Sequence, residues 1–339
     1  KTDLSNRLIT LDQLAVTGAF TLDPHGTGAV IIVNAVNLNL AASTMGGTFS
    51  GTATQGDISD SGDLAITGAA KFITTQAAQD IILDQSGNAF TSHVTMQAGN
   101  GDNAAFNDIT FVDTNGVDLV SSTPSAGDLF IDASTDLDVD GALSITATTG
   151  NITQGSELAV GTTSTFTTSA SDGTITLNDA DNTFTGAVAL NTNGSSGNAT
   201  IKDKAADLQL AASSVGGALI ATATAGNITQ NGALTITGTS TLVTSADNAT
   251  ITLNDGGNTF TGKLLITTND ADVGTQGTVN VHGGTTNLIL GASTIDGNLT
   301  LTSGGTITDD GIATVRGTLT ATTNQLHKII TLNQLAVTG

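Results

Sequence analysis

Apolar and polar residues alternate along many short stretches of this chain. Leu, Ile or Val occupies every second position, with Thr, Asn or Asp between, which is the pattern of a strand with one buried face. Gly, Asn-Gly, Asp-Gly and Gly-Gly separate the stretches and favour turns. Strands are predicted, for example, at residues 233–237, 250–253, 263–267, 278–281, 288–290 and 298–302. No window has a helical period of useful length, so the chain is predicted to be all-β.

The strands belong to a repeat, because whole segments recur at one fixed spacing. The segments GNITQ, ITLND and NTFTG each occur twice. They start at positions 150 and 226, 175 and 251, and 182 and 258, so the offset between the two copies is the same in all three cases. Self-similarity at one period is the sequence signature of a repeat architecture.

One column of leucines extends the repeat unit over the whole chain: Leu11, Leu83, Leu177, Leu253 and Leu332. It divides the chain into units of approximately 11–82, 83–176, 177–252 and 253–331, with 332–339 starting the next unit. The second unit is the longest, and we assign its extra residues to a peripheral insertion at about 98–127, because surface loops absorb insertions. We predict one continuous array over residues 1–339 and no separate domains.

The two ends of the sequence carry a longer repeat. ITLDQLAVTG at residues 9–18 returns as ITLNQLAVTG at residues 330–339. The four repeat units between these two copies therefore make one larger cycle. We expect the chain to be one period of a longer array, or a subunit whose ends continue each other.

Two architectures fit these strands: a parallel β-helix (β-solenoid) of tandem units of about 80 residues, and a string of Ig-like β-sandwich domains. A sandwich usually has an aromatic anchor and linkers, whereas this chain has no Trp, no Tyr and only two Pro residues. A narrow solenoid coil is also expected to leave little room for large rings. We therefore predict the solenoid. Division of each unit into four coils would make a coil about 19 residues long.

Charge and hydropathy exclude several partners. The formal net charge is −22, with 8 Lys and Arg against 30 Asp and Glu. Binding of nucleic acid or anionic lipid needs clustered cations, so neither is expected. No apolar run approaches the roughly 18 residues of a membrane-spanning helix, so membrane insertion is not expected. The absence of cysteine excludes a disulfide framework.

The segment ALTITGTSTLVTSADNATITLNDGGNTFTGKLLIT, residues 233–267, resembles the β-strand repeats of giant bacterial surface exoproteins. These are grouped with filamentous-haemagglutinin-like and autotransporter-like adhesins. The matching elements are GNITQ, ALTITG, ITLND and NTFTG, and they cover most of residues 46–308. The resemblance implies export to the bacterial cell surface, a β-helical shaft and a structural or adhesive role.

We accordingly expect an extracellular fibre, a repeat segment of a giant surface or matrix protein that stacks end to end or laterally with copies of itself. The alternative is the shaft of an adhesin whose tip binds a cell-surface or polysaccharide ligand. An ice-binding solenoid is less favoured, because Ser, Asn, Asp and Lys interrupt the Thr-x-Thr pairs such as Thr235 and Thr237.

No residue set predicts catalysis, so the chain is not expected to be an enzyme, a polysaccharide lyase included. Lyases and hydrolases need acid and base groups gathered in a cleft. The histidines are scattered and do not recur with the repeat: His25, His93, His282 and His327.

One acidic motif, DLDVDG at residues 136–141, is a weak candidate for a calcium site. Asp136, Asp138 and Asp140 could offer the hard oxygen ligands that Ca²⁺ prefers. The twelfth position of such a loop is Ala147 in place of a bidentate Glu, which excludes an EF-hand. A solvated polar face is the alternative, and no other cofactor is expected.

Overall fold

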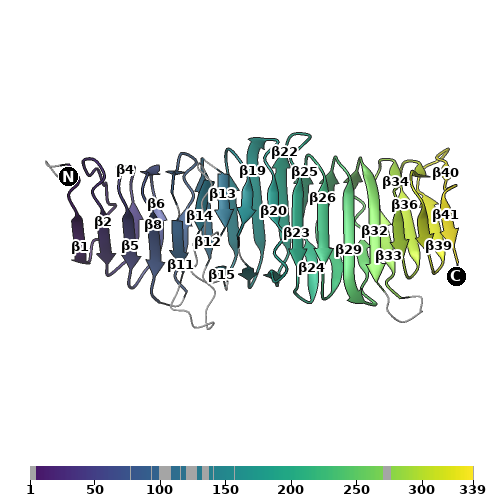
Figure 1. The fold of residues 1–339 in the computed structure, drawn as a ribbon, viewed down its shortest axis with the longest axis horizontal. Helices are drawn as coiled ribbons and strands as arrows, with labels where there is room; N and C mark the ends of the chain where they lie inside the picture. The colour runs from purple at the N-terminus through teal and green to yellow at the C-terminus, as the bar shows by residue number, and fades with distance from the viewer. Residues whose placement is uncertain are drawn as a thin grey trace. The chain divides into compact units, whose positions relative to one another are not determined.

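The computed structural model describes residues 5–338 except 77, 93, 99–107, 115, 120–127, 132–136, 140, 156 and 270–275. Within these residues every regular element is a strand, numbered β1 to β41 along the chain (Figure 1). No helix of the described chain is long and apolar enough to cross a membrane. The chain divides into two compact halves, residues 1–170 and residues 171–339, which we describe separately.

The N-terminal half begins with β1 (Ile9–Leu14), after which the strands fall into three columns. The first column is β2 (Val30–Asn34), β5 (Phe49–Ala53), β8 (Ala70–Thr74) and β11 (Val94–Gln97). The second is β3 (Leu38–Leu40), β6 (Ile58–Asp60), β9 (Ile81–Leu83) and β12 (Ile109–Asp113). The third is β4 (Ser43–Met45), β7 (Leu64–Ile66) and β10 (Ala89–Phe90). The half continues with β13 (Gly116–Leu119), β14 (Asp128–Ile131), β15 (Leu137–Val139), β16 (Leu143–Ala147), β17 (Ile152–Gln154), β18 (Leu158–Val160) and β19 (Ser164–Ser171).

The C-terminal half repeats the arrangement after β20 (Ile175–Leu177), β21 (Thr183–Phe184) and β22 (Val188–Asn193). Its first column is β23 (Ala199–Asp203), β26 (Leu219–Ala223), β29 (Ser240–Asp247) and β32 (Lys263–Asn269). The other two columns are β24 (Asp207–Leu210), β27 (Asn227–Gln230) and β30 (Ile251–Leu253), and β25 (Ser213–Val215), β28 (Leu234–Ile236) and β31 (Thr259–Phe260). Nine strands follow: β33 (Val279–His282), β34 (Leu288–Leu290), β35 (Ser293–Ile295), β36 (Leu299–Ser303), β37 (Ile307–Asp309), β38 (Ala313–Val315), β39 (Leu319–Thr323), β40 (Ile330–Thr331) and β41 (Leu335–Val337).

Three strands make one coil, and each strand pairs in parallel with the strand of the next coil. In the first column Val30 lies opposite Phe49, and Phe49 lies opposite Ala70, so one coil runs from Val30 to Phe49 and the next from Phe49 to Ala70. In the C-terminal half Ala199, Leu219 and Ser240 are aligned in the same way. Parallel coils of three short strands confirm the predicted β-solenoid. Tandem sandwiches are excluded, because their sheets are antiparallel.

Alternation of side chains builds the core, as the sequence pattern predicts. Along β5, Phe49, Gly51 and Ala53 are buried, while Ser50 and Thr52 between them are partly exposed. Parallel register then stacks buried residue on buried residue from coil to coil, giving one apolar interior inside each half. The predicted strands agree closely with the observed ones; residues 278–281, for example, become Val279–His282.

The groups β2–β11 and β23–β32 contain ten strands each, which is one more than three coils need, and the group β12–β22 between them contains eleven. In the group β23–β32, β32 stacks on the first column, so the next group starts one face further round. Accordingly β33 stacks on β30 of the second column, with Val279 opposite Ile251. The same step occurs where β12 stacks on β9, where β23 stacks on β20 and where β2 stacks on β1. A ten-strand group therefore makes three and a third coils, in place of the four coils per unit considered from the sequence.

Phenylalanines occupy the core, which corrects the expectation that a coil has little room for large rings. Phe49, Phe72, Phe90 and Phe111 are fully buried in the N-terminal half. Their neighbouring ring centroids lie 5.3, 6.1 and 5.1 Å apart, within the usual range for aromatic pairs. The coil interior therefore accommodates a continuous stack of four rings.

The predicted insertion at 98–127 contains a core strand. Within that range β12 pairs with β9 and β16, and both Ile109 and Phe111 are buried. Residues 109–113 are therefore core and not peripheral loop. Residues 99–107, 115 and 120–127 of the predicted insertion lie outside the described chain.

Candidate functional site

The predicted calcium ligands fall mostly outside the described residues. Asp136 and Asp140 are not described, and of Asp138 only the main chain is, on β15 opposite Ala159 of β18. Elsewhere in the described chain, no three His, Cys, Asp or Glu side chains are grouped so that they could hold a metal ion.

Among the described histidines, His282 has the most defined contacts. Its Nδ1 accepts a hydrogen bond from the Gly284 main-chain N–H at 2.9 Å, and its Nε2 lies 3.3 Å from Asn324 Nδ2. Both ring nitrogens thus contact groups of the protein itself. Neither contact is to an acid or a nucleophile, so these contacts do not form a catalytic arrangement.

The best-defined polar features are buried contacts between coils, several of them where one group of strands joins the next, and three serines form the first of them. Ser43, Ser213 and Ser293 occupy equivalent positions on β4, β25 and β35, and all three are almost fully buried. Each hydroxyl accepts a main-chain N–H bond from the preceding coil, at 2.9–3.0 Å: from Leu22, from Leu190 of β22 and from Ile266 of β32 respectively. Each donates back to a carbonyl two residues earlier in the chain. The serine therefore satisfies a buried N–H that would otherwise be costly to leave unpaired.

Asparagine and aspartate form the second junction contact. Asn34, Asp113 and Asp203 occupy the last position of the first strand of a group, and all are fully buried. The Oδ1 atom of each accepts a main-chain N–H from the preceding coil at 2.9–3.1 Å: from Val16, Phe90 and Phe184 respectively. The fourth equivalent position, Gly283, has no side chain to do so.

A third contact comes from the asparagine of the NTFTG motif. Asn258 accepts the Leu234 N–H through Oδ1 at 2.8 Å and donates through Nδ2 to Gln230 Oε1 at 2.9 Å. Asn88 likewise accepts the Leu64 N–H at 2.9 Å and donates to Asp60 Oδ2 at 2.6 Å. Asn88 occupies the equivalent position in the sequence NAFTS, and Asn182 of the other NTFTG copy donates through Nδ2 to the Lys202 carbonyl at 3.2 Å. All three asparagines are fully buried.

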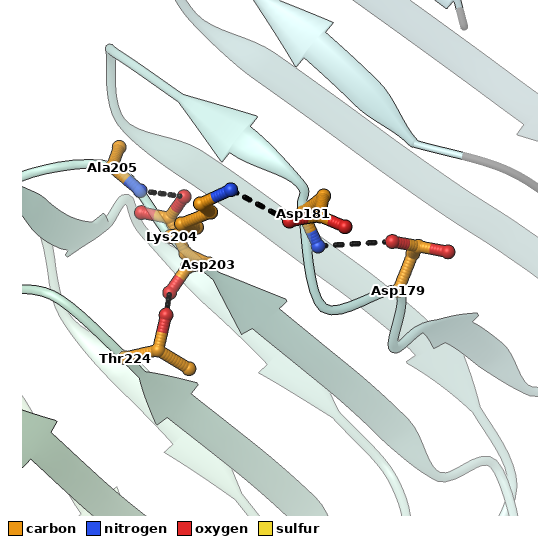
Figure 2. Close-up of polar contacts among 6 residues, drawn as sticks. All are labelled: Asp179, Asp181, Asp203, Lys204, Ala205 and Thr224. Atoms are coloured by element: carbon orange, nitrogen blue, oxygen red, sulfur yellow. Dashed lines mark hydrogen bonds and ion pairs between the residues drawn. The ribbon is translucent and has the colours of Figure 1, made fainter.

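Figure 2 shows the junction around Asp203. Its Oδ1 accepts the N–H of Ala205. The same atom accepts the N–H of Phe184, while Oδ2 has no hydrogen-bond partner among the described residues. Burial raises the pKa of Asp203 despite these bonds, because the carboxylate loses its hydration. Thr224 Oγ1 donates to the Asp203 carbonyl at 3.1 Å and ties the next coil to it.

The same view contains an exposed ion pair. Lys204 Nζ lies 2.6 Å from Asp181 Oδ1, and this hydrogen bond and charge hold the pKa of Asp181 below its usual value. Asp181 in turn donates its main-chain N–H to Asp179 at 2.9 Å. Two further cations also pair across coils: Lys263 with Asp310 at 2.7 Å, and Arg316 with Asp296 at 2.9 Å. Lys204 and Arg316 thus join neighbouring coils, and Lys263 reaches a carboxylate two coils away.

A shallow apolar groove lies on the outer face of the first column in the N-terminal half. Ile31, Ser50, Lys71 and Thr95 are aligned across β2, β5, β8 and β11 and line it. Lys71 makes no ion pair among the described residues. The groove places the cation of Lys71 beside apolar side chains, which is an arrangement suited to an anionic group with an apolar part.

The serine contact was missed in the sequence, although a signal for it exists. Ala-Ser followed by Ser or Thr occurs at Ala42, Ala133, Ala212 and Ala292, once in each repeat unit. The serine of the second copy, Ser134, lies outside the described residues. Small polar residues inside an apolar strand were the available signal, because a buried hydroxyl needs a partner.

Comparison with known families identifies the same four-fold repeat. A family model described as "Repeats of unknown function (DUF5649)" matches residues 27–97, 106–191, 196–267 and 276–337. The first and third matches coincide with the ten-strand groups β2–β11 and β23–β32. No curated protein and no solved structure matches the chain.

Proposed function

The chain belongs to this family of repeats of unknown function, and we propose that it is a structural segment of an extracellular fibre on the bacterial surface or in its matrix. Its role would be mechanical: it extends the solenoid and presents an acidic, Thr-rich exterior. Adhesion to a surface and lateral contacts with other copies belong to the same proposal. No chemical reaction is proposed for it.

The observation that carries this proposal is the use of the buried polar side chains. The serines on β4, β25 and β35 and the acceptors Asn34, Asp113 and Asp203 all bond to the main chain of a neighbouring coil. Polar groups that are committed to the scaffold in this way stabilise a stack of coils. They are not available to a substrate.

A second candidate, the shaft of an adhesin, is favoured by the groove at Lys71. Its apolar strip and cation fit an acidic polysaccharide better than a neutral one. Binding of the purified chain to polygalacturonate, lost in Lys71→Ala and retained in Lys328→Ala, would favour the adhesin shaft over the purely mechanical fibre.

Electron microscopy of the purified chain and of the native material tests the fibre proposal. We expect uniform filaments whose width is that of one solenoid or of a few side by side. Particles that stay single at every concentration, with no fibre in the native material, would contradict it. Cleavage of acidic polysaccharide by the purified chain would replace it with an enzymatic role, and loss of filaments in EDTA would add a calcium requirement.

A further inference from the structure

The equivalent junction residues Asn34 and Asp203 differ in one side-chain atom. Both accept a main-chain N–H of the preceding coil through Oδ1. The second terminal atom of the asparagine is an N–H donor, whereas that of an ionised aspartate is an acceptor oxygen. The groups around this second atom therefore show which of the two side chains the junction favours.

The second atom of Asn34 is surrounded by main-chain carbonyl groups. Its Nδ2 donates to the Val16 carbonyl at 2.8 Å and to the Asn37 carbonyl at 2.7 Å. Asn34 is fully buried, so these bonds satisfy a donor that water does not reach. In this junction the position thus holds a hydrogen-bond donor.

The surroundings of Asp203 correspond to those of Asn34. Asp203 accepts the N–H of Phe184 at 3.1 Å, and Asn34 accepts the N–H of Val16 at 2.9 Å. In both junctions the following residue donates its main-chain N–H to a carbonyl of the preceding coil, at 2.7 Å: Ala35 to Leu14, and Lys204 to Asn182. The Phe184 carbonyl is therefore the counterpart of the Val16 carbonyl, which accepts from Asn34.

An ionised Asp203 has no donor to offer in that place. The residue is fully buried, and its Oδ2 has no hydrogen-bond partner among the described residues. A buried charged oxygen without a donor is costly. A proton on Oδ2 removes the charge and supplies the donor that the asparagine has at this position.

The charges around Asp203 do not offset this cost. The charged residues of its own segment and of the preceding coil are Lys202, Lys204, Asp207, Asp179 and Asp181. The neighbouring strands β20, β22 and β26 carry none. Lys204 pairs with Asp181 (Figure 2). Burial is the main cause of the raised pKa of Asp203, and the negative charge of Asp207 adds to it.

We propose that Asp203 is a pH switch at the junction between two coils. In the protonated form its Oδ2–H donates to the Phe184 carbonyl, as Asn34 donates to the Val16 carbonyl, and holds the coils together. In the ionised form the carboxylate keeps only the N–H bonds that Oδ1 accepts from Phe184 and Ala205. The junction then opens more readily. The switch belongs to the junction itself, so it does not depend on whether the chain forms a fibre.

The junction is expected to be most stable in acid. Because the pKa of Asp203 is raised above its ordinary value of 3.8, the native state binds the proton more tightly than the unfolded state does. The stabilisation is therefore complete below pH 3.8 and is lost as the pH rises through the raised pKa. Between these two values the equilibrium constant for opening should rise by up to about tenfold per pH unit.

Exchange of the two side chains in the full chain tests the switch. Hydrogen exchange of each variant is compared with that of the wild type at the same pH, so that the intrinsic exchange rate cancels. We expect Asp203→Asn to exchange more slowly than the wild type in β20, β23 and β26 at neutral pH, with the difference vanishing in acid. Asn34→Asp should exchange faster in β2 and β5 at neutral pH and recover in acid.

Asp12→Asn is the matched control. Asp12 is exposed, and Asn333 already has the amide at the same place in the second copy of the ten-residue end repeat. Its exchange should equal that of the wild type at every pH. A pH dependence as large as that of Asp203→Asn would overturn the switch, because it would report the net charge of the chain.

Two further outcomes would contradict the switch. A constant ratio between Asp203→Asn and the wild type at every pH would overturn it, and would indicate that a buried water satisfies Oδ2. If Asp203→Asn did not fold, Asn34→Asp would decide alone: destabilisation that acid does not reverse would overturn the switch, and recovery in acid would support it.

Discussion

β5 in the N-terminal half and β26 in the C-terminal half occupy the same place in their ten-strand groups, yet they fill the core differently. β5 reads FSGTA and β26 reads LIATA, and both have alternate residues buried. Phe49 and Gly51 of β5 correspond to Leu219 and Ala221 of β26. A Cβ added to Gly51 would lie 2.8 Å from the Phe49 ring, so the ring uses the space that the alanine methyl group fills in β26.

The two halves also differ at the corner that precedes the second column. In the N-terminal half Asp57, Asp80 and Asp108 are stacked, and each accepts the main-chain N–H of the next coil, at 2.8–3.0 Å. In the C-terminal half Asn227 and Thr250 occupy the positions of Asp57 and Asp80, and Asp207 lies one coil before them; Asp207 and Asn227 accept the same kind of bond at 2.8 and 2.7 Å. At the position of Asp57 and Asn227 the acceptor oxygen is therefore retained, whereas the charge is not.

This comparison shows what the fold requires at each position. The main-chain register and an acceptor at the corner of Asp57 and Asn227 are common to both halves. The choice between an aromatic ring and a methyl group in the core can vary if the neighbouring residue changes with it. The same holds for the choice between a carboxylate and an amide at the corner. Substitutions that convert one half into the other therefore test the comparison, and we order them by expected effect.

The largest effect is expected from Phe72→Ala, because Phe72 stands between Phe49 and Phe90 in the ring stack. Truncation of a buried phenylalanine costs about 3–5 kcal/mol. Since a solenoid's stability is close to a sum over neighbouring coils, the loss should be confined to the N-terminal half. Hydrogen exchange followed by mass spectrometry would show faster exchange in β5, β8 and β11.

The matched control is Leu242→Ala, at the equivalent position of β29 in the C-terminal half. It is fully buried and has no ring neighbour in that column. We expect a cost of about 2–5 kcal/mol and faster exchange in β26, β29 and β32 only. Equal acceleration in both halves, in either variant, would show that the halves do not unfold independently.

The next effect is expected from Arg316→Thr in the C-terminal half. Asp296 and Arg316 correspond to Gly46 and Thr67 in the N-terminal half, so both members of the ion pair are present together or absent together. The Asp296 side chain is 7% exposed and the Arg316 side chain 48%. Loss of the arginine leaves a buried carboxylate without its cation, which we expect to cost about 1–3 kcal/mol in a denaturant titration.

Asp296→Gly combined with Arg316→Thr provides the rescue, because it installs the residues of the N-terminal half. We expect the double variant to recover most of the lost stability. A double variant as unstable as the single one would show that the arginine acts by packing its side chain and not by charge.

The kind of fold was predictable from the sequence, whereas the junctions were not. Period-two alternation located the strands, and the fixed spacing of GNITQ, ITLND and NTFTG established the repeat. Each group starts one face further round the solenoid, and this shift depends on how many strands the group contains. That number could not be counted from the sequence, because a two-residue strand such as β31 has no periodicity to detect. The junction serines were hidden because one Ser in an apolar strand looks like an outward residue.

An intermediate effect is expected from Gly51→Ala, which gives β5 the methyl group of β26 without its leucine. The new Cβ would meet the Phe49 ring and the Leu38 side chain at 2.8 and 2.9 Å. Overpacking of this kind costs about 1–3 kcal/mol, and we expect the lower end because a ring can tilt. Phe49→Leu added to Gly51→Ala should recover part of the loss, since it completes the β26 combination. Additive losses in this cycle, measured by denaturant titration, would show that ring and glycine are not coupled.

The smallest effect is expected from Asp80→Asn, which replaces a charged corner by an amide. Burial, followed by the charges of Asp108 and Asp57, raises the pKa of Asp80 above its ordinary value of 3.8. The native state then binds the proton more tightly than the unfolded state does, so stability falls as the pH rises from near 3.8 through the raised pKa. The amide keeps the acceptor for the Asp108 N–H without this penalty. We expect a gain of less than about 1 kcal/mol at neutral pH that disappears in acid, measured by denaturant titration across pH.

The reverse change, Asn227→Asp, places a second carboxylate beside Asp207 in the C-terminal half. It also removes the bond from Asn227 Nδ2 to Asp207 Oδ1, at 2.7 Å. We expect a loss of about 1 kcal/mol at neutral pH that shrinks in acid, because protonation of either carboxylate relieves the repulsion. If Asp80→Asn instead weakened the N-terminal half at neutral pH, the carboxylate charge would be stabilising there. The difference between the two corners would then reflect a requirement for charge in one half, and not the interchangeability of two acceptors.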